Sequence, residues 1–121
     1  MKVLIADSNN LIRVGLRTVI AQHISNAQIV EAATGSILKK ILQSDPPDVV
    51  LIDYTAREFT IDVLPEAKAI APQVPFVAIT YDQMGKTIID ALRMGVTSYI
   101  KKDCDIGEIV DAVKDLSLIH I

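Results

Sequence analysis

The sequence predicts an α/β domain in which a single five-stranded parallel sheet is doubly wound, with helices on both of its faces. Short runs rich in β-branched residues alternate along the chain with segments of helical periodicity. Most of the strand-like runs are continuously hydrophobic, as expected for parallel strands that are buried on both faces. The 121 residues suit one compact domain, and half of them are hydrophobic, which is enough for a core.

The first half of the chain is expected to contain three strands and two helices. Ser8 stands directly before the first helical segment and is a suitable N-cap for it. Pro46 and Pro47 mark the loop before the third strand. The expected strands are 3–6, 29–32 and 49–52, and the expected helices are 9–22 and 36–43.

The second half is expected to contain three helices and two strands. The third helix should lie between residues 60 and 71, but Pro65 falls inside this segment. Since proline disrupts a helix interior and is tolerated in a first turn, the helix either starts late, near Leu64, or is kinked. The remaining expected elements are strands 76–79 and 98–100 and helices 84–94 and 106–116.

Polar side chains follow the hydrophobic runs at the points where strands should end. Asp7 and Asp53 follow the first and third strands, Thr80 follows the fourth, and Lys101 and Lys102 follow the fifth. Because the carboxyl ends of parallel strands meet at one edge of a sheet, these groups should face one shallow cleft. Two close carboxylates repel each other unless a cation separates them or one is protonated. With Mg2+, a lysine and a hydroxyl, they could hold a phosphoryl group and accept it on a carboxylate.

From residue 2 to about residue 116, the chain resembles the receiver domains of bacterial two-component response regulators. The closest likeness is to receivers that precede LuxR-type (NarL-type) DNA-binding domains. The matching segments, in order, are KVLIAD, LIRVGLRTVI, PDVVLID, VPFVAIT and ALRMGVTSYIKKD, followed by a closing helix. The resemblance implies the strand order 2-1-3-4-5, a receiver domain over residues 1–116, and a tail or linker to an absent output domain at 117–121.

The resemblance also implies roles for individual residues. Asp53 matches the aspartate that accepts the phosphoryl group, and Thr80 matches the hydroxyl that binds it. Lys102, rather than Lys101, matches the lysine that pairs with the acceptor and the phosphoryl group. Tyr99 matches the aromatic residue that turns inward when Thr80 shifts. The implied Mg2+ ligands are Asp7, Asp53 and the backbone carbonyl of Thr55.

Ser8 departs from the family pattern, because it replaces the second acidic residue, which is the direct metal ligand. The lost attraction for a divalent ion amounts to roughly several kcal/mol for a carboxylate at about 4 Å and an effective dielectric near 20. We therefore expect Mg2+ to bind weakly, with little or no contribution from Ser8. Tyr81 stands where a small residue is usual, so it is expected to cover the pocket, and the loop TAREFT lacks the usual Met-Pro pair.

Two functions remain open. In the first, a sensor histidine kinase phosphorylates Asp53, and the domain switches an interaction surface to control an output such as transcription. The output is expected to be homodimerisation or release of its own or a partner's DNA-binding domain. In the second, the domain is a pseudo-receiver, an interaction or dimerisation module with weak or no phosphorylation. In both cases it is not an enzyme beyond its own phosphorylation and dephosphorylation.

The overall composition limits the partners and the compartment. A net charge of −3 disfavours direct nucleic-acid contact, which needs a basic surface. The hydrophobic runs are too short to cross a membrane, and no signal peptide opens the chain. The single cysteine, Cys104, cannot form an internal disulfide, which favours a reducing compartment. A cytoplasmic location is therefore expected.

Overall fold

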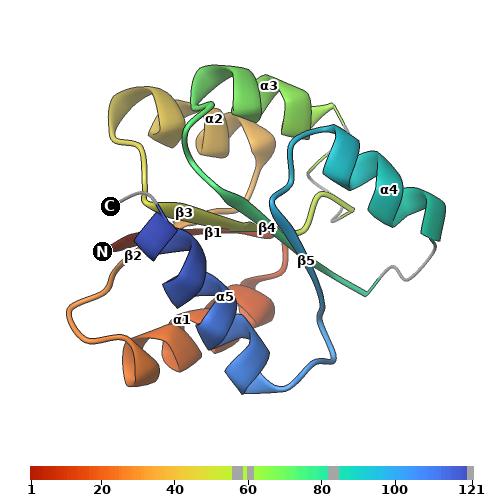
Figure 1. Cartoon of the computed structure of the whole chain (residues 1–121). Coiled ribbons are helices and arrows are strands. Elements are labelled where there is room, and N and C mark those ends of the chain that lie inside the picture. Colours follow the sequence, from red (N-terminus) through yellow and green to blue (C-terminus); the bar gives the residue numbers. More distant parts are fainter. Residues whose placement is uncertain (56–58, 60–61, 82–84, 120–121) are drawn as a thin grey trace.

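The computed structural model describes residues 1–55, 59, 62–81 and 85–119, and its centre is a five-stranded parallel sheet (Figure 1). The strand order is β2-β1-β3-β4-β5, which confirms the expected order. The strands are β1 (Lys2–Ala6), β2 (Gln28–Ala32), β3 (Val49–Ile52), β4 (Phe76–Thr80) and β5 (Ser98–Lys101). Each lies within two residues of its expected bounds.

Five helices cover the two faces of this sheet. In Figure 1, α1 and α5 lie on one face, and α2, α3 and α4 lie on the other. They are α1 (Asn10–His23), α2 (Gly35–Ser44), α3 (Val63–Ile70), α4 (Gly85–Arg93) and α5 (Ile106–Ile119). Among the described residues, no helix combines the length and the apolar character needed to span a bilayer.

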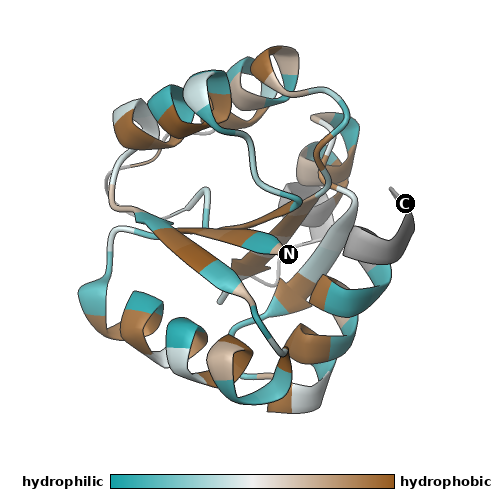
Figure 2. Ribbon diagram, turned by 90° about the vertical axis from the view of Figure 1, so that its left-hand side faces the viewer, coloured by the Kyte–Doolittle hydropathy of each residue, from teal (hydrophilic) through white to brown (hydrophobic). Residues whose placement is uncertain are grey.

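The core consists of two hydrophobic clusters, one on each side of the sheet. One contains Leu4 from β1 together with Leu38 from α2, and the other contains Ile5 from β1 together with Ile20 from α1. Neighbouring residues of one strand thus point into different clusters. Hydrophobic colour accordingly follows the strands in Figure 2, whereas the helices carry it only in part. This arrangement explains why the strands read as continuous apolar runs.

The N-cap of α1 is Asn9, so the expectation that Ser8 caps this helix is wrong. The Oδ1 atom of Asn9 accepts hydrogen bonds from the backbone N of Leu11 at 2.9 Å and of Ile12 at 3.2 Å. Asn9 has extended backbone angles, as an N-cap requires. Since the backbone N of Asn9 also donates to Oδ1 of Asp7 at 2.8 Å, Ser8 lies inside a turn that starts at Asp7.

The structure also shows where α3 begins relative to Pro65 and where α5 ends. α3 begins at Val63, so Pro65 lies in its first turn, where no intrahelical bond needs the missing N–H group. The late-start alternative is therefore confirmed. α5 continues to Ile119, beyond the expected end at residue 116. Part of the segment 117–121 thus extends this helix.

Candidate functional site

Asp7 and Asp53 lie side by side at the carboxyl edge of the sheet. β1 and β3 are adjacent, with Ala6 paired to Ile52, so the residues that follow these two positions are also neighbours. The backbone N of Asp53 donates to the carbonyl O of Ala6 at 3.0 Å, which continues the strand pairing by one step. Asp7 is 2% exposed and Asp53 is 6% exposed. The fold thus buries two acidic side chains next to each other.

Lys102 supplies the cation between these carboxylates. Its Nζ atom lies 2.7 Å from Oδ2 of Asp7 and 2.6 Å from Oδ2 of Asp53. The backbone N of Lys102 donates to the carbonyl O of Thr80 at 3.0 Å, which anchors the residue directly after β5. Lys101, by contrast, is exposed. The structure therefore brings Lys102, and not Lys101, to the two acids.

The pKa of Lys102 is set by two opposing effects. Burial disfavours the charged ammonium and by itself lowers the pKa of Lys102. The hydrogen bonds to Asp53 and Asp7, together with the attraction of their charges, outweigh this effect and leave the pKa of Lys102 above its ordinary value. The lysine is therefore positively charged at this site at neutral pH.

Two threonines extend the cluster away from Lys102. Thr55 donates to Oδ1 of Asp53 twice, from its backbone N at 2.9 Å and from its hydroxyl at 2.5 Å. The same hydroxyl lies 2.9 Å from Oγ1 of Thr80, which is fully buried at the end of β4. A continuous chain of polar contacts thus runs from Asp7 through Lys102, Asp53 and Thr55 to Thr80.

Ser8, Tyr81 and Tyr99 surround this chain of contacts. Ser8 is partly exposed in the turn after β1. Tyr81 is 61% exposed, and its ring centre lies 5.4 Å from Nζ of Lys102, within the range of a cation–π contact. Tyr99 is partly buried and packs against the hydrophobic cluster that contains Leu4 and Leu38. Residues 56–58 and 60 of the loop TAREFT lie outside the described residues.

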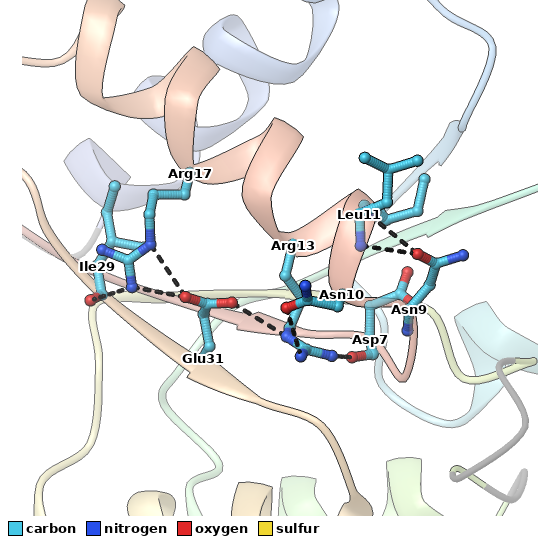
Figure 3. A network of polar contacts seen from close by, with 9 residues as sticks. Asp7, Asn9, Asn10, Leu11, Arg13, Arg17, Ile29 and Glu31 are labelled. Carbon is cyan, nitrogen blue, oxygen red and sulfur yellow. Dashed lines mark hydrogen bonds and ion pairs between the residues drawn. The ribbon is translucent and has the colours of Figure 1, made fainter.

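Sequence reasoning missed a second polar network, which fixes the turn after β1 (Figure 3). Nη1 of Arg13 donates to the carbonyl O of Asp7 at 2.6 Å, and its Nε donates to Oε1 of Glu31 at 3.0 Å. Nη2 of Arg17 donates to Oε2 of Glu31 at 2.7 Å. The sequence does contain a signal for this network: two arginines four residues apart share one helix face, and Glu31 is a charged residue in an otherwise uncharged strand.

Electrostatics favour the ionised form of Glu31. The hydrogen bond from Arg17 lowers the pKa of Glu31, and partial burial opposes this shift. The contact with Arg13 and the charges of both arginines add to the lowering, so the pKa of Glu31 lies below its ordinary value. The turn that carries Asp7 and Ser8 is thus tied to β2 through a charged pair.

The oxygen atoms of this site fit Mg2+ only in part. Carboxylate oxygens are the ligands that Mg2+ prefers, and Asp7 and Asp53 supply them. One oxygen of each carboxylate already accepts a hydrogen bond from Lys102. Within the described residues, no group of three Asp, Glu, His or Cys side chains is arranged to hold a metal ion. Among the residues that the structure describes, the site therefore offers two acidic ligands, Asp7 and Asp53.

Charged groups that directly follow β1, β3 and β5 meet at the carboxyl edge of a doubly wound sheet, as expected for a domain of the receiver class. Comparison with protein families agrees with this assignment. Residues 3–114 match the model of the response regulator receiver domain, and the chain belongs to this family. The identification made from the sequence is thus confirmed.

Individual relatives show the same relationship. The chain is 31% identical over 111 residues to the uncharacterized transcriptional regulatory protein YhcZ of Bacillus subtilis, covering 91% of this chain and 52% of YhcZ. It is 28% identical over 115 residues to the response regulator protein VraR of Staphylococcus epidermidis, covering 94% and 55% of the two chains. The chain thus spans about half the length of these curated relatives.

A crystal structure supports the fold assignment. A LuxR-family two-component response regulator from Aurantimonas sp. SI85-9A1 superposes with a TM-score of 0.88 at 21% identity, covering 97% of this chain and 84% of that one. Receiver domains are signalling domains, generally not enzymes, and they generally bind Mg2+ for phosphorylation. Response regulators interact with histidine kinases and with DNA-binding output domains. The roles of individual residues in this chain stay predictions.

Proposed function

We propose that this domain accepts a phosphoryl group on Asp53 from the phosphohistidine of a sensor kinase. The observation that carries the proposal is the position of Lys102, whose Nζ lies within 2.7 Å of carboxylate oxygens of both Asp7 and Asp53. This ammonium is a positive partner for two buried acidic side chains that lie next to each other. It also remains available as a positive partner for an incoming phosphoryl group.

In the proposed transfer, a carboxylate oxygen of Asp53 attacks the phosphorus atom of the donor. A P–O bond forms, the P–N bond to the donor imidazole breaks, and its electron pair leaves with the imidazole nitrogen. Mg2+, when bound, would neutralise charge on the phosphoryl oxygens. Lys102 and the hydroxyl of Thr80 would hold these oxygens, and Asp7 and Asp53 would be the acidic ligands of the metal.

Access to Asp53 is limited but suits a small group. The carboxylate is 6% exposed, and two exposed residues contact the cluster above it: Thr55 bonds to Asp53, and Tyr81 stacks near Lys102. On this proposal, Thr55 and Tyr81 move when the phosphoryl donor reaches Asp53. Phosphorylation would then shift an equilibrium between two surfaces of the domain, with Tyr99 as the residue that follows Thr80.

The output is proposed from the relatives. YhcZ is named a transcriptional regulatory protein, and the Aurantimonas protein is a LuxR-family regulator. We therefore propose that the switched surface controls a DNA-binding domain, either by homodimerisation or by release of that domain. The acidic net charge of −3 fits a domain that does not itself contact nucleic acid.

A pseudo-receiver is the second candidate, and Ser8 is the observation that favours it. With Ser8 in place of an acid, Lys102 is the cation that balances the two carboxylates among the described residues, so on this proposal the domain is stable without Mg2+ and without phosphorylation. On this proposal the fold serves as a cytoplasmic interaction module. The choice between the two functions depends on how tightly Mg2+ binds.

The test is to incubate the domain with Mg2+ and acetyl phosphate, and to measure its intact mass. Phosphorylation is expected in the wild-type chain and not in Asp53→Asn, which lacks the acceptor oxygen. Amide exchange with Mg2+ and beryllofluoride should show protection at Asp53 and Lys102. An unchanged mass and unchanged amide exchange at saturating Mg2+ would contradict phosphorylation and favour the pseudo-receiver.

A Ser8→Asp variant tests whether residue 8 lies among the ligands of Mg2+. A third carboxylate should raise the affinity for Mg2+ at least tenfold, which corresponds to about 1.4 kcal/mol. Titration of Mg2+ by calorimetry measures the change, and Ser8→Asn is the neutral control of similar size to Asp. Equal affinities in the two variants would mean that residue 8 lies outside the metal shell.

A further inference from the structure

Thr55 joins the acceptor carboxylate to the buried hydroxyl of Thr80. Its hydroxyl lies 2.5 Å from Oδ1 of Asp53 and 2.9 Å from Oγ1 of Thr80. Thr55 itself is exposed, whereas Thr80 is 0% exposed. A surface side chain thus contacts both the residue that would be modified and the residue that would respond to it.

The directions of these two hydrogen bonds follow from the number of protons. An ionised carboxylate can only accept, so the single hydroxyl proton of Thr55 is donated to Asp53. The hydroxyl oxygen of Thr55 must then act as the acceptor in its contact with Thr80. Thr80 therefore donates its own single proton to Thr55, while its oxygen can still accept hydrogen bonds from other groups.

We propose that Thr55 is a positioning residue that holds Thr80 in its unphosphorylated orientation, and that a phosphoryl group on Asp53 releases Thr80 by competing for the same proton. This inference rests on the proposed function for the identity of the incoming group. Phosphoryl oxygens are ionised, and hydrogen bonds to ionised acceptors are roughly twice as strong as those between neutral groups. Because Thr80 has one proton, it cannot donate to Thr55 and to the phosphoryl group at once.

Phosphorylation of Asp53 also weakens the hydrogen bond from the hydroxyl of Thr55 to Asp53. When Asp53 becomes an acyl phosphate, its carboxyl group loses its negative charge, so Oδ1 becomes a poorer acceptor for Thr55. Both bonds of Thr55 are thus strongest in the unmodified site. Breaking the hydrogen bonds of Thr55 therefore uses part of the free energy gained when the phosphoryl group binds, and Thr55 determines how large this part is.

The first measurement uses the unmodified protein. Three-bond couplings from the methyl carbon of Thr80 to its backbone N and carbonyl carbon report its χ1 rotamer. We expect one rotamer in the wild type and in Thr55→Ser, which keeps the hydroxyl, and rotamer averaging in Thr55→Val, which keeps the shape. Thr97→Val, at an exposed position before β5, is the matched control and should equal the wild type. A single rotamer in Thr55→Val, or averaging in Thr55→Ser, would overturn the inference.

The second measurement titrates the same variants with beryllofluoride at saturating Mg2+. Thr55→Val should bind about fivefold more tightly than the wild type, because one net hydrogen bond no longer has to be broken. Thr55→Ser and Thr97→Val should bind as the wild type does. Weaker or equal binding by Thr55→Val would also overturn the inference. If no variant binds beryllofluoride, the proposed function fails, and the couplings of Thr80 alone decide the role of Thr55.

Discussion

At the scale of single residues, Lys102 pairs with two buried acidic side chains at once. Its side chain is 8% exposed, and the side chains of Asp7 and Asp53 are 3% and 6% exposed. Removing such charges from water is costly, and the cost is compensated only while each charge has a partner. Lys102 is the partner of both acids, so its loss would leave two buried carboxylates facing each other.

We expect Lys102→Met to lower the free energy of unfolding by about 3 kcal/mol or more at neutral pH, because it leaves buried charges without a counterion. Urea denaturation measures this change. Lys101→Met is the matched control, since its exposed side chain should change stability by no more than about 0.5 kcal/mol. Equal stabilities of the two variants would contradict the importance given to the buried ammonium.

The same lysine predicts a dependence on alkaline pH. The pKa of Lys102 lies above its ordinary value of 10.5, so the folded state holds this proton more tightly than the unfolded state. The resulting stabilisation is complete below pH 10.5 and is lost as the pH rises through the folded-state pKa. This alkaline loss should be smaller in Lys102→Met than in the wild type when unfolding is followed across that range.

At the scale of elements, the turn between β1 and α1 does two tasks at once. Its polar groups cap α1 through Asn9 and fix the carboxylate of Asp7 through the backbone N of Asn9. Arg13 then returns from α1 to hold the carbonyl O of Asp7 at 2.6 Å. The start of the helix and the position of an acidic site residue are therefore determined together.

Asn9→Ala should destabilise the domain by about 1 kcal/mol, because two backbone N–H groups of α1 lose their acceptor. Thermal or urea unfolding measures the loss. Asn9→Asp should retain most of the stability, since its carboxylate can accept the same bonds. Ser8→Ala should change stability by less than about 0.5 kcal/mol, and a larger effect there than at Asn9 would contradict the assigned cap.

Glu31→Gln should lower stability by about 1 kcal/mol or less at neutral pH, since the pair is partly exposed and screened by solvent. Because the pKa of Glu31 is lowered from 4.5, the stabilisation is present above that pH and is lost as the pH falls through the folded-state pKa. The difference between Glu31→Gln and the wild type should therefore disappear in acid. Asp111→Asn, at an exposed position of α5, provides the control for removing one acid.

Local sequence signals predicted these elements well and predicted their polar contacts poorly. Hydrophobic spacing was enough to find every strand, and Pro65 correctly suggested a late start for α3. Both Ser8 and Asn9 are good N-cap residues, and which of them caps α1 depends on where the chain leaves β1. The hydroxyl of Thr55 was missed because its partner Thr80 lies 25 residues away, and only the folded sheet brings the two together.

At the scale of the whole molecule, one sheet separates two hydrophobic clusters that have no side chains in common. Ile20 of α1 belongs to one cluster and Leu38 of α2 to the other, and both are 0% exposed. Each strand nevertheless sends side chains into both clusters, so neither cluster can form without the same sheet. The two clusters should therefore unfold as one cooperative unit.

Ile20→Ala and Leu38→Ala should each cost about 3 kcal/mol, because each creates a cavity at a fully buried position. If the clusters form one cooperative unit, both variants should keep the wild-type dependence on urea concentration. Leu11→Ala, at a residue that is 76% exposed, is the control and should change stability by less than about 0.5 kcal/mol. A shallower or two-step transition in only one variant would indicate that its half unfolds separately.

The whole fold was predictable because its determinants repeat along the chain. Alternation of strand-like and helix-like segments required a parallel sheet, and the ends of its strands placed Asp7, Asp53, Thr80 and Lys102 on one edge. The strand order came only from resemblance to a family, since apolar runs do not specify their neighbours. The Arg13–Glu31–Arg17 network left a signal in the sequence, but the pairing itself depends on how α1 crosses β2, which the sequence does not specify.

The two edge strands of the sheet determine how easily another chain can add to it. An outermost strand offers unpaired amide and carbonyl groups to any other chain, and a charged side chain on such a strand discourages this addition. β2 and β5 are the outermost strands; β2 carries Glu31 with its two guanidinium partners, and β5 ends with exposed Lys101. An intruding strand would have to strip water from these ions. The ion cluster that holds the turn after β1 should therefore also disfavour the addition of another chain to β2.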